Sequence, residues 1–347
     1  MDSHNVKGLC GLVNFGNTCY MNSAIQCLSH IHNFRAYFTS KDFSKDINRE
    51  KDEIKLVVEW YKVINALWQE NSVVKPQSFR NEVRMLAFKQ GINLNLVGNG
   101  QNDVQEFLLF LISSLHNGLS KKVNMNISGK VVNDLDRKAL EAFKSWRLFF
   151  KDDYSKLVEL FYGQHISNIY SLDKVLLSTT YEPFCYLTLP IPDKNNISIQ
   201  DCLDCYTQYE RLQGDNKWYN EKTKEYEECY KQIKFWNTPQ VLIIVLKRFL
   251  NSGEKNNSLV DFPLDNLDLS HLSLGYGAHK NKYELRSIAN HIGSLGGGHY
   301  FAYSLHRDNK KWYCYNDSVV REVSEQDLVS EKAYCLFYEK KTSDFKK

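Results

Sequence analysis

One cysteine stands where a thiol could act as a nucleophile. Residues 11–23 read GLVNFGNTCYMNS, a glycine-rich turn that leads into an amphipathic helix with Cys19 at the junction. Asn17 or Thr18 could cap this helix, and the positive end of its dipole is expected to lower the pKa of the Cys19 thiol. Asn14 and nearby backbone N–H groups could donate to an oxyanion. The alternative, a buried cysteine that only packs, fits this segment equally well.

A nucleophilic cysteine needs a base, and the base needs a partner that orients it. Three glycines, 296–298, precede His299 between two expected strands, where a histidine is not expected to belong to the core. The strand that follows ends in Asn316 and Asp317, and either side chain could lie against the imidazole. An ordinary Asn-Asp turn explains this pair as well, and the spacing alone does not bring the three positions together.

The elements that must hold these residues differ between the two parts of the chain. Apolar residues recur at helical spacing in the first part, in 20–31, 53–69, 103–117 and 134–150, with a further helix expected from Pro76. After about residue 162 the chain is rich in short β segments, which are 184–191, 241–249, 283–291, 300–306, 312–316 and 333–338. Two brief helices there begin with capping-box signatures at Ser198 and Ser324. This order predicts an α+β fold.

The composition is that of a soluble globular protein. The 347 residues are 43% hydrophobic and 24% charged, with a net charge of +3 that is too small to argue for nucleic acid or a membrane surface. No run of about 18 apolar residues predicts a transmembrane helix. The first residues lack a signal peptide, so we expect an intracellular protein, in the cytoplasm or nucleus, with thiols rather than disulfides. Abundant Lys, Asn and Tyr suit an AT-rich genome, such as that of a protist or a large virus, and a viral protein would act in the host cell.

Several motifs, in this order, resemble those of the ubiquitin-specific proteases, a papain-like family of deubiquitinating enzymes. Residues 11–23 resemble the family's cysteine box, and the histidine box is matched by Tyr283-x-Leu285, His291-x-Gly293 and GGHYFAY at 297–303. The motifs between the two boxes are QNDVQEFL at 101–108, YEPF at 181–184, LKRF at 246–249 and VDFP at 260–263. The resemblance extends from about Gly8 to Tyr338.

The resemblance implies a role for each matching residue. Cys19 would be the nucleophile, His299 the general base and Asn316 the third member of the catalytic group. Asp317 would assist, and Asn14 would help to form an oxyanion hole. The chain would then be a cysteine-type ubiquitin carboxyl-terminal hydrolase. It would cleave the isopeptide, peptide or thioester bond at the C-terminal glycine of ubiquitin.

The resemblance also implies a channel for ubiquitin's Leu-Arg-Gly-Gly tail. Asp103 and Glu106 lie three residues apart on an expected helix and would pair with the tail's arginines. Tyr300 would wall the channel, which Gln101 and Gly298 would border. The alternatives are an ordinary acidic first turn of a helix for the two carboxylates and a packed strand aromatic for Tyr300.

The family fold is a right hand with thumb, palm and fingers. Within a single catalytic domain, 1–347, we expect a helical thumb at 8–160, fingers with part of the palm at 161–240, and a palm with the histidine box at 241–340. We expect no appended targeting domain and no cofactor. The expected partners are ubiquitin and ubiquitinated proteins, with no nucleic acid and no membrane, and the protein is expected to be a monomer.

One feature of many family members, a zinc ribbon of two Cys-x-x-Cys pairs in the fingers, is missing. The positions that match the four ligands hold Ser171, Lys174, Asn220 and Thr223. These side chains form no tetrahedral zinc site, so we predict fingers without a metal.

Two other pairs of potential metal ligands are better explained otherwise. Cys202 and Cys205 form a Cys-x-x-Cys on an expected helix, but no second pair follows at ribbon spacing. His30 and His32 are expected at the solvated end of a helix.

Two other functional classes remain open. An inactive ubiquitin-binding scaffold usually lacks the cysteine or the histidine, and both Cys19 and His299 are present. A protease for another ubiquitin-like modifier is not excluded, because the tails of those modifiers also end in Gly-Gly.

Overall fold

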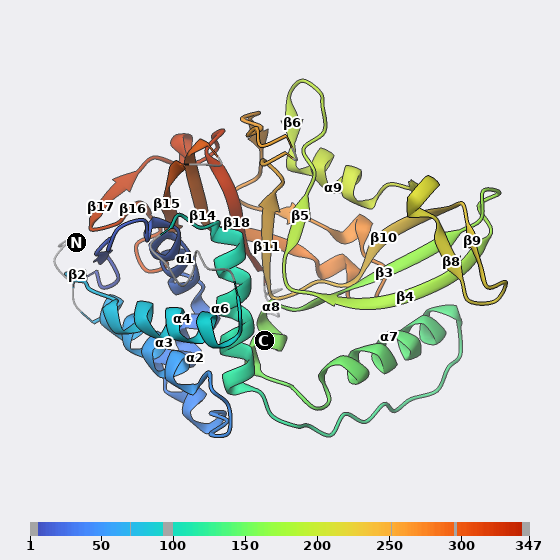
Figure 1. Ribbon diagram of the computed structural model, residues 1–347, viewed down its shortest axis with the longest axis horizontal. Helices are drawn as coiled ribbons and strands as arrows, with labels where there is room; N and C mark the ends of the chain where they lie inside the picture. Colours follow the sequence, from blue (N-terminus) through green and yellow to red (C-terminus); the bar gives the residue numbers. More distant parts are fainter. Residues whose placement is uncertain (1–5, 70, 93–99, 251, 295–296, 342–347) are drawn as a thin grey trace.

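The computed structural model describes residues 6–69, 71–92, 100–250, 252–294 and 297–341, and helices and sheets segregate along the chain (Figure 1). Helices that precede residue 120 gather on the left of Figure 1, and strands of the second part form a central sheet and a smaller distal sheet to its right. The α+β prediction is therefore confirmed. Within the described ranges, no helix has the length and apolar character needed to cross a membrane.

The helices lie close to the segments in which apolar residues recur. They are α1 (Cys19–Ser29), α2 (His32–Thr39), α3 (Ile54–Leu67), α4 (Gln77–Lys89), α6 (Val104–Leu119), α7 (Asp134–Phe150), α8 (Lys156–Phe161) and α9 (Ile199–Thr207). The capping box predicted at Ser198 opens α9. The one predicted at Ser324 is not formed, and only a 3-10 turn, Glu325–Asp327, follows that serine.

The central sheet has the strand order β17-β16-β15-β14-β18-β11-β5, and β13 also pairs with β14. In that order the strands are β17 (Val319–Val323), β16 (Trp312–Asn316), β15 (Gly297–Leu305), β14 (Lys282–Ser294), β18 (Ala333–Lys340), β11 (Val241–Leu246), β5 (Leu187–Leu189) and β13 (Leu267–Asp268). β11 reads VLIIVL and all six residues are buried. Alternate residues of β11 belong to two apolar clusters, one shared with α1, α3 and α6 and the other with α9. Both faces of the sheet are covered, which explains why β11 is apolar throughout.

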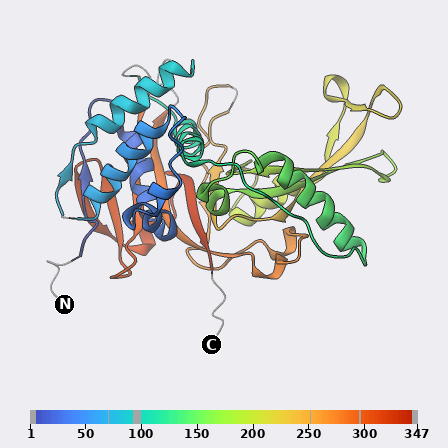
Figure 2. The ribbon, with the colours of Figure 1, turned by 90° about the horizontal axis from the view of Figure 1, so that it is seen from below.

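The distal sheet has the order β4-β3-β10-β7, and α7 runs along its β4 edge (Figures 1 and 2). The strands are β4 (Leu176–Phe184), β3 (Gly163–Tyr170), β10 (Cys229–Asn237) and β7 (Glu210–Leu212). The remaining strands form three two-stranded pairs, β1 (Gly11–Leu12) with β2 (Val73–Val74), β6 (Ile197–Ser198) with β12 (Val260–Asp261), and β8 (Trp218–Asn220) with β9 (Glu225–Glu227).

Packing of α1 on the central sheet determines where chemistry can occur. Every residue of α1 is buried, and the helix packs against β14, β15 and β16. The antiparallel register of β15 and β16 pairs Ala302 with Tyr315, so the start of β15 lies beside the end of β16. His299 and Asn316 are therefore neighbours at these strand ends.

Candidate active site

The turn before α1 is held in shape by Asn14. Its Oδ1 accepts hydrogen bonds from the backbone N–H of Gly16 at 2.9 Å and of Thr18 at 3.2 Å. Gly16 and Asn17 have φ values of 86° and 54°, in the left-handed region that glycine and asparagine tolerate best. Thr18 is the N-cap, but its hydroxyl makes no capping bond and instead contacts Asn14 and the N–H of Phe15. Of the two predicted caps, Thr18 therefore holds the N-cap position, but without the side-chain bond expected of it.

Cys19 is the first residue of α1 and is only 6% exposed. Burial raises the pKa of its thiol above the ordinary value of 9.0, and the negative charge of Asp317 adds to this, while the backbone N–H of Tyr300 lowers it. The expectation that the helix dipole would lower the pKa of Cys19 is therefore wrong, because desolvation of the thiolate outweighs the local donors. A thiol in this setting needs a base to become a nucleophile.

His299 is positioned by Asn316. The Nε2 of His299 lies 2.7 Å from the Oδ1 of Asn316, and an amide oxygen accepts, so the imidazole carries its proton on Nε2. This tautomer leaves Nδ1 unprotonated and able to take a proton. The backbone N–H of the next residue, Tyr300, lies against the Cys19 thiol, so the cysteine and the histidine belong to one site.

Asp317 does not contact the imidazole. Its two carboxylate oxygens accept from Asn14 Nδ2 at 3.0 Å and from Asn22 Nδ2 at 2.8 Å, and its backbone oxygen accepts from the N–H of Leu12 at 2.7 Å. Of the two polar residues that could have faced His299, only Asn316 is bonded to it. Asp317 instead ties the end of β16 to the turn before α1. Asn22 was not singled out from the sequence, although it lies one helical turn after Cys19.

Asp103 is the N-cap of α6, and its carboxylate is held from two sides. One oxygen accepts from the N–H of Gln105 at 2.6 Å and the other from the hydroxyl of Tyr334 at 2.7 Å. Burial raises the pKa of Asp103, whereas these two donors lower it. Glu106 lies in the first turn of α6 and is exposed, so the two carboxylates differ in environment. Sequence reasoning missed Tyr334, because no local pattern links it to a residue 231 positions away.

An aromatic wall lies beside Asp103. Tyr300 is 7% exposed, and its ring lies 4.5 Å from that of His291 and 6.3 Å from that of Tyr334. His291 itself is 2% exposed, and burial lowers its pKa to about 4. The Tyr300 ring is therefore packed, as expected if it were an ordinary strand aromatic. It also borders the carboxylate of Asp103.

One hydrogen bond joins the segment before α6 to the start of β15. The Oε1 of Gln101 accepts from the backbone N–H of Gly298 at 2.8 Å. A side chain at Gly298 would collide with Nε2 of His291, which a Cβ would approach to 2.1 Å. Glycine is therefore required beside His299 for close packing. Gly296, the first of the three glycines, lies outside the described residues.

The four positions that match zinc ligands are occupied by side chains with other partners. Asn220 Nδ2 and Thr223 Oγ1 both donate to the Oε1 of Glu227, at 2.9 and 2.6 Å. The hydroxyl of Ser171 accepts from the N–H of Val175 at 3.1 Å. The Lys174 ammonium lies 5.6 Å from the centre of the Tyr209 ring. These groups do not fit a zinc ion. Within the described ranges, no three His, Cys, Asp or Glu residues are arranged to hold a metal.

Cys202 and Cys205 lie on α9, as predicted. Cys202 is fully buried, and burial raises the pKa of its thiol to about 12. A thiol that ionises so poorly is suited to packing rather than to metal binding or redox chemistry.

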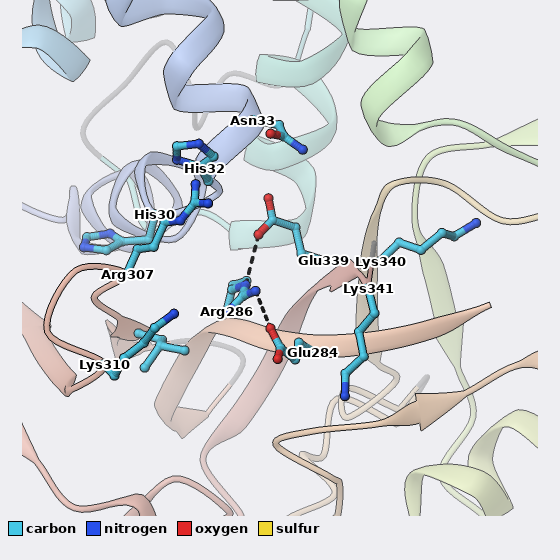
Figure 3. Close-up of a pocket in the computed structure, with 11 residues that line it drawn as sticks. His30, His32, Asn33, Glu284, Arg286, Arg307, Lys310, Glu339, Lys340 and Lys341 are labelled. Atoms are coloured by element: carbon cyan, nitrogen blue, oxygen red, sulfur yellow. Dashed lines mark hydrogen bonds and ion pairs between the residues drawn. The ribbon is translucent and has the colours of Figure 1, made fainter. Parts of the chain in front are cut away.

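A polar pocket of about 420 Å³ lies at the other end of α1 (Figure 3). Arg286 in this pocket pairs with both Glu284 and Glu339. An eleven-residue helix is about 16 Å long, so this pocket is separate from the site around Cys19.

His30 at the edge of this pocket is not solvated. It is 4% exposed, with Nδ1 2.8 Å from the carbonyl oxygen of Gln26 and Nε2 2.9 Å from the hydroxyl of Tyr315. Burial lowers its pKa to about 3. The prediction of a solvated helix end is wrong for His30, because its ring packs against those of Trp68 and Tyr315.

Residues 10–338 match the family described as Ubiquitin carboxyl-terminal hydrolase. The chain is 35% identical over 343 residues to Ubiquitin carboxyl-terminal hydrolase Usp2 of Drosophila melanogaster, covering 96% of this chain and 35% of that protein. It is 33% identical over 347 residues to Ubiquitin carboxyl-terminal hydrolase 2 of Homo sapiens, covering 98% of this chain and 56% of that protein. The chain thus spans between about a third and somewhat more than half of these relatives.

A solved structure has the same fold. The SAGA DUB module of Ubp8, Sgf11, Sus1 and Sgf73 bound to monoubiquitin contains a chain that superposes with a TM-score of 0.72 at 26% sequence identity, covering 99% of this chain and 71% of that one. The resemblance inferred from the motifs is thereby confirmed. The chain belongs to the ubiquitin carboxyl-terminal hydrolase family.

Proposed function

We propose that this protein is a thiol-dependent deubiquitinase that hydrolyses the bond after the C-terminal glycine of ubiquitin. The observation that carries the proposal is the hydrogen bond of 2.7 Å between His299 and Asn316, formed beside the buried thiol of Cys19. An oriented imidazole next to a cysteine is the arrangement that thiol acyl transfer requires. Membership of the family supports the choice of ubiquitin.

In the proposed mechanism, His299 takes the proton from the Cys19 thiol. The thiolate attacks the carbonyl carbon of ubiquitin's last glycine, and a tetrahedral intermediate forms. His299 then gives its proton to the leaving lysine amine, and Cys19 is left as a thioester. Water, deprotonated by His299, attacks the thioester and releases ubiquitin. The raised pKa of Cys19 makes the base indispensable in the first step.

Asn14 is the proposed side-chain donor to the oxyanion. Its Oδ1 is committed to the turn before α1, and one Nδ2 hydrogen is committed to Asp317. A carboxamide has two N–H donors, so one remains for the intermediate. In this scheme Asp317 is a positioning residue, because it orients Asn14 and does not touch the reacting atoms.

Asp103, Glu106, Tyr300, Gln101 and Gly298 are proposed to form the channel for the ubiquitin tail. The half-buried carboxylate of Asp103 and the exposed one of Glu106 would meet the tail's arginines. The bond between Gln101 and Gly298 would limit the width of the channel next to His299. Small glycine residues of a Gly-Gly terminus suit a channel that is narrow at this point.

We also propose the division into thumb, fingers and palm at 8–160, 161–240 and 241–340. It is supported by the packing of α1 to α6 on one face of the central sheet and by the separate distal sheet. We propose that the protein acts inside the cell, because its nine cysteines are free, and that it acts as a monomer.

The first experiment is hydrolysis of a ubiquitin C-terminal fluorogenic substrate by the wild type, Cys19→Ala and His299→Ala. Activity that disappears in both variants supports the proposal. Probes that carry a C-terminal electrophile on ubiquitin and on related modifiers are run in competition. Exclusive labelling by another modifier would move the assignment to that modifier. A folded wild type that is neither labelled nor active would contradict the proposed reaction.

A further inference from the structure

A cavity of about 430 Å³ lies between α7, α8 and the end of β10, away from the residues proposed for catalysis. Its volume is in the range of ligand sites in proteins. Six of the twelve residues that line it are aromatic, and the side chains on which the proposal rests are Phe143, Trp146, Tyr154, Glu159, Trp236 and Tyr276.

The rings of this cavity are held in place by neighbours outside it. Trp236 is 5% exposed and meets Tyr181 edge-to-face, with ring centres 5.8 Å apart. The ring centres of Trp146 and Phe150 lie 4.6 Å apart. Tyr276, which is 54% exposed at the rim, donates its hydroxyl proton to Asp136 on α7. The wall is therefore built before any ligand arrives.

The cavity has a negative character. Among the described residues that line the cavity, Glu159 is the one charged side chain, and none is a lysine or an arginine. The faces of aromatic rings carry partial negative charge and attract cations. The Glu159 carboxylate accepts from the hydroxyl of Tyr154 and pairs with Lys156, which is exposed and lies outside the lining. A ligand cation would compete with that lysine for the Glu159 carboxylate.

We propose that this cavity binds the guanidinium group of an arginine side chain on a partner protein. A guanidinium is flat and weakly hydrated, so it can stack on indole and phenol rings while it pairs with one carboxylate. An uncharged apolar side chain could not pair with the Glu159 carboxylate, and an ammonium is more strongly hydrated than a guanidinium. The chain already contains one such contact, in which the Arg35 guanidinium lies 3.4 Å from the centre of the Trp68 ring.

The test follows the indole N–H signals of the six tryptophans by two-dimensional NMR during titration with acetyl-Gly-Arg-Gly-amide. We expect shifts of the Trp146 and Trp236 signals, assigned with Trp→Phe variants. The same peptide with citrulline, which is uncharged and nearly isosteric, should give none. Because ubiquitin hydrolysis is not measured, the outcome is independent of the proposed enzyme activity.

Four variants examine the contacts one at a time. Glu159→Gln should weaken binding up to about fivefold, and Tyr276→Ala should weaken it about twofold to thirtyfold, the range of a single cation–π contact. Lys156→Met should strengthen binding, since it frees the carboxylate. Glu141→Gln, an exposed site on α7 outside this cavity, is the matched control and should change nothing.

Three results would overturn the proposal. They are an absence of indole shifts up to the solubility limit of the arginine peptide, equal shifts with citrulline, and binding of a trimethyllysine peptide in place of the arginine peptide.

Discussion

Asn316 and Asp317 are adjacent in the chain, yet their side chains serve different parts of the site. Asn316 accepts from the His299 imidazole, whereas Asp317 accepts from Asn14 in the turn before α1 and from Asn22 within α1. Asp317 reaches this position with φ of 49°, in the left-handed region that asparagine and aspartate tolerate. A tight turn at the end of β16 thus separates orientation of the base from orientation of the proposed oxyanion donor.

Because Asp317 orients Asn14, we expect substitutions of these two residues to have non-additive effects on kcat. Asn14→Ala should reduce kcat on the order of 100- to 1,000-fold, as is typical for loss of one oxyanion donor. Asp317→Ala should reduce kcat by no more than that, and the double variant should be no worse than Asn14→Ala alone. Steady-state kinetics with a ubiquitin fluorogenic substrate measure all three. Fully additive losses would show that Asp317 does not act through Asn14.

The pKa of Cys19 predicts how the free enzyme reacts with an alkylating agent. Only the thiolate reacts, and burial raises the pKa above 9.0, so little thiolate is present at neutral pH. The rate of Cys19 alkylation by iodoacetamide, followed by mass spectrometry, should keep rising as the pH passes 9. Asp317→Asn removes a negative charge that raises this pKa, so the midpoint should shift to lower pH.

The control for alkylation is Asp308→Asn, an exposed aspartate outside the site, which should leave the profile unchanged. A rate that is already at its plateau near pH 7 would mean that the thiolate is preformed, and the assignment of His299 as an obligatory base would then fail.

Tyr334 is predicted to matter for ubiquitin binding through Asp103. Tyr334→Phe removes the hydroxyl that donates to Asp103 at 2.7 Å, and this loss should raise the pKa of the carboxyl further. We expect KM for the ubiquitin substrate to rise about threefold to tenfold, the loss typical of one hydrogen bond, with a larger effect at lower pH.

Tyr338→Phe is the matched control for Tyr334, because Tyr338 is also buried in β18 and donates to the carbonyl of Pro263 at 2.8 Å. It should destabilise the fold to a similar degree and leave KM unchanged. An equal rise in KM for both variants would indicate a general loss of packing.

The hairpin of β8 and β9 is predicted to depend on Glu227 rather than on a metal. Glu227→Ala leaves Asn220 and Thr223 without their shared acceptor, and Asn220 is only 7% exposed. Loss of these bonds should lower the free energy of unfolding by about 1–3 kcal/mol, as measured in urea. Glu225→Ala, at an exposed site on the same strand, should have little effect.

A chelator should leave both the stability and the activity of the wild type unchanged. Metal analysis of the purified protein completes this test, and stoichiometric zinc would contradict the hydrogen-bonded replacement of the ribbon.

Buried histidines are predicted to make the fold sensitive to acid. The pKa of His30 falls from 6.5 to about 3 on folding, so its neutral form is favoured in the native state. The contribution of His30 to the free energy of unfolding is complete above pH 6.5. It is lost as the pH falls toward 3, with a slope of about 1.4 kcal/mol per pH unit. His30→Gln should be less stable at pH 7 but should show a shallower decline between pH 6.5 and 4.

Urea unfolding at several pH values measures this slope. The free energy of unfolding of His279→Gln, a variant at an exposed site, should decline with falling pH as steeply as that of the wild type. If His30→Gln has the same slope as the wild type, the acid sensitivity comes from other groups.

Much of the fold was accessible from local patterns. Apolar residues at helical spacing indicated α1, α3, α6 and α7, Pro76 indicated the start of α4, and the predicted β segment 241–249 contains β11. The six-residue α8 was too short for a periodic signal. The motifs around Cys19 and His299 indicated the family, and the absence of four cysteines indicated that no zinc ribbon could form.

Tertiary structure decided the relationships that depend on distant residues. Whether Asn316 or Asp317 meets His299 was settled by the turn that closes β16, and the pairing of Tyr334 with Asp103 joins residues 231 positions apart. The direction of the pKa shift of Cys19 was also a tertiary property. The sequence placed this thiol at a helix start, where local dipoles lower a pKa, but only packing of α1 against the central sheet removes water from it. Desolvation acts through the whole surrounding fold, so no local pattern could have revealed it.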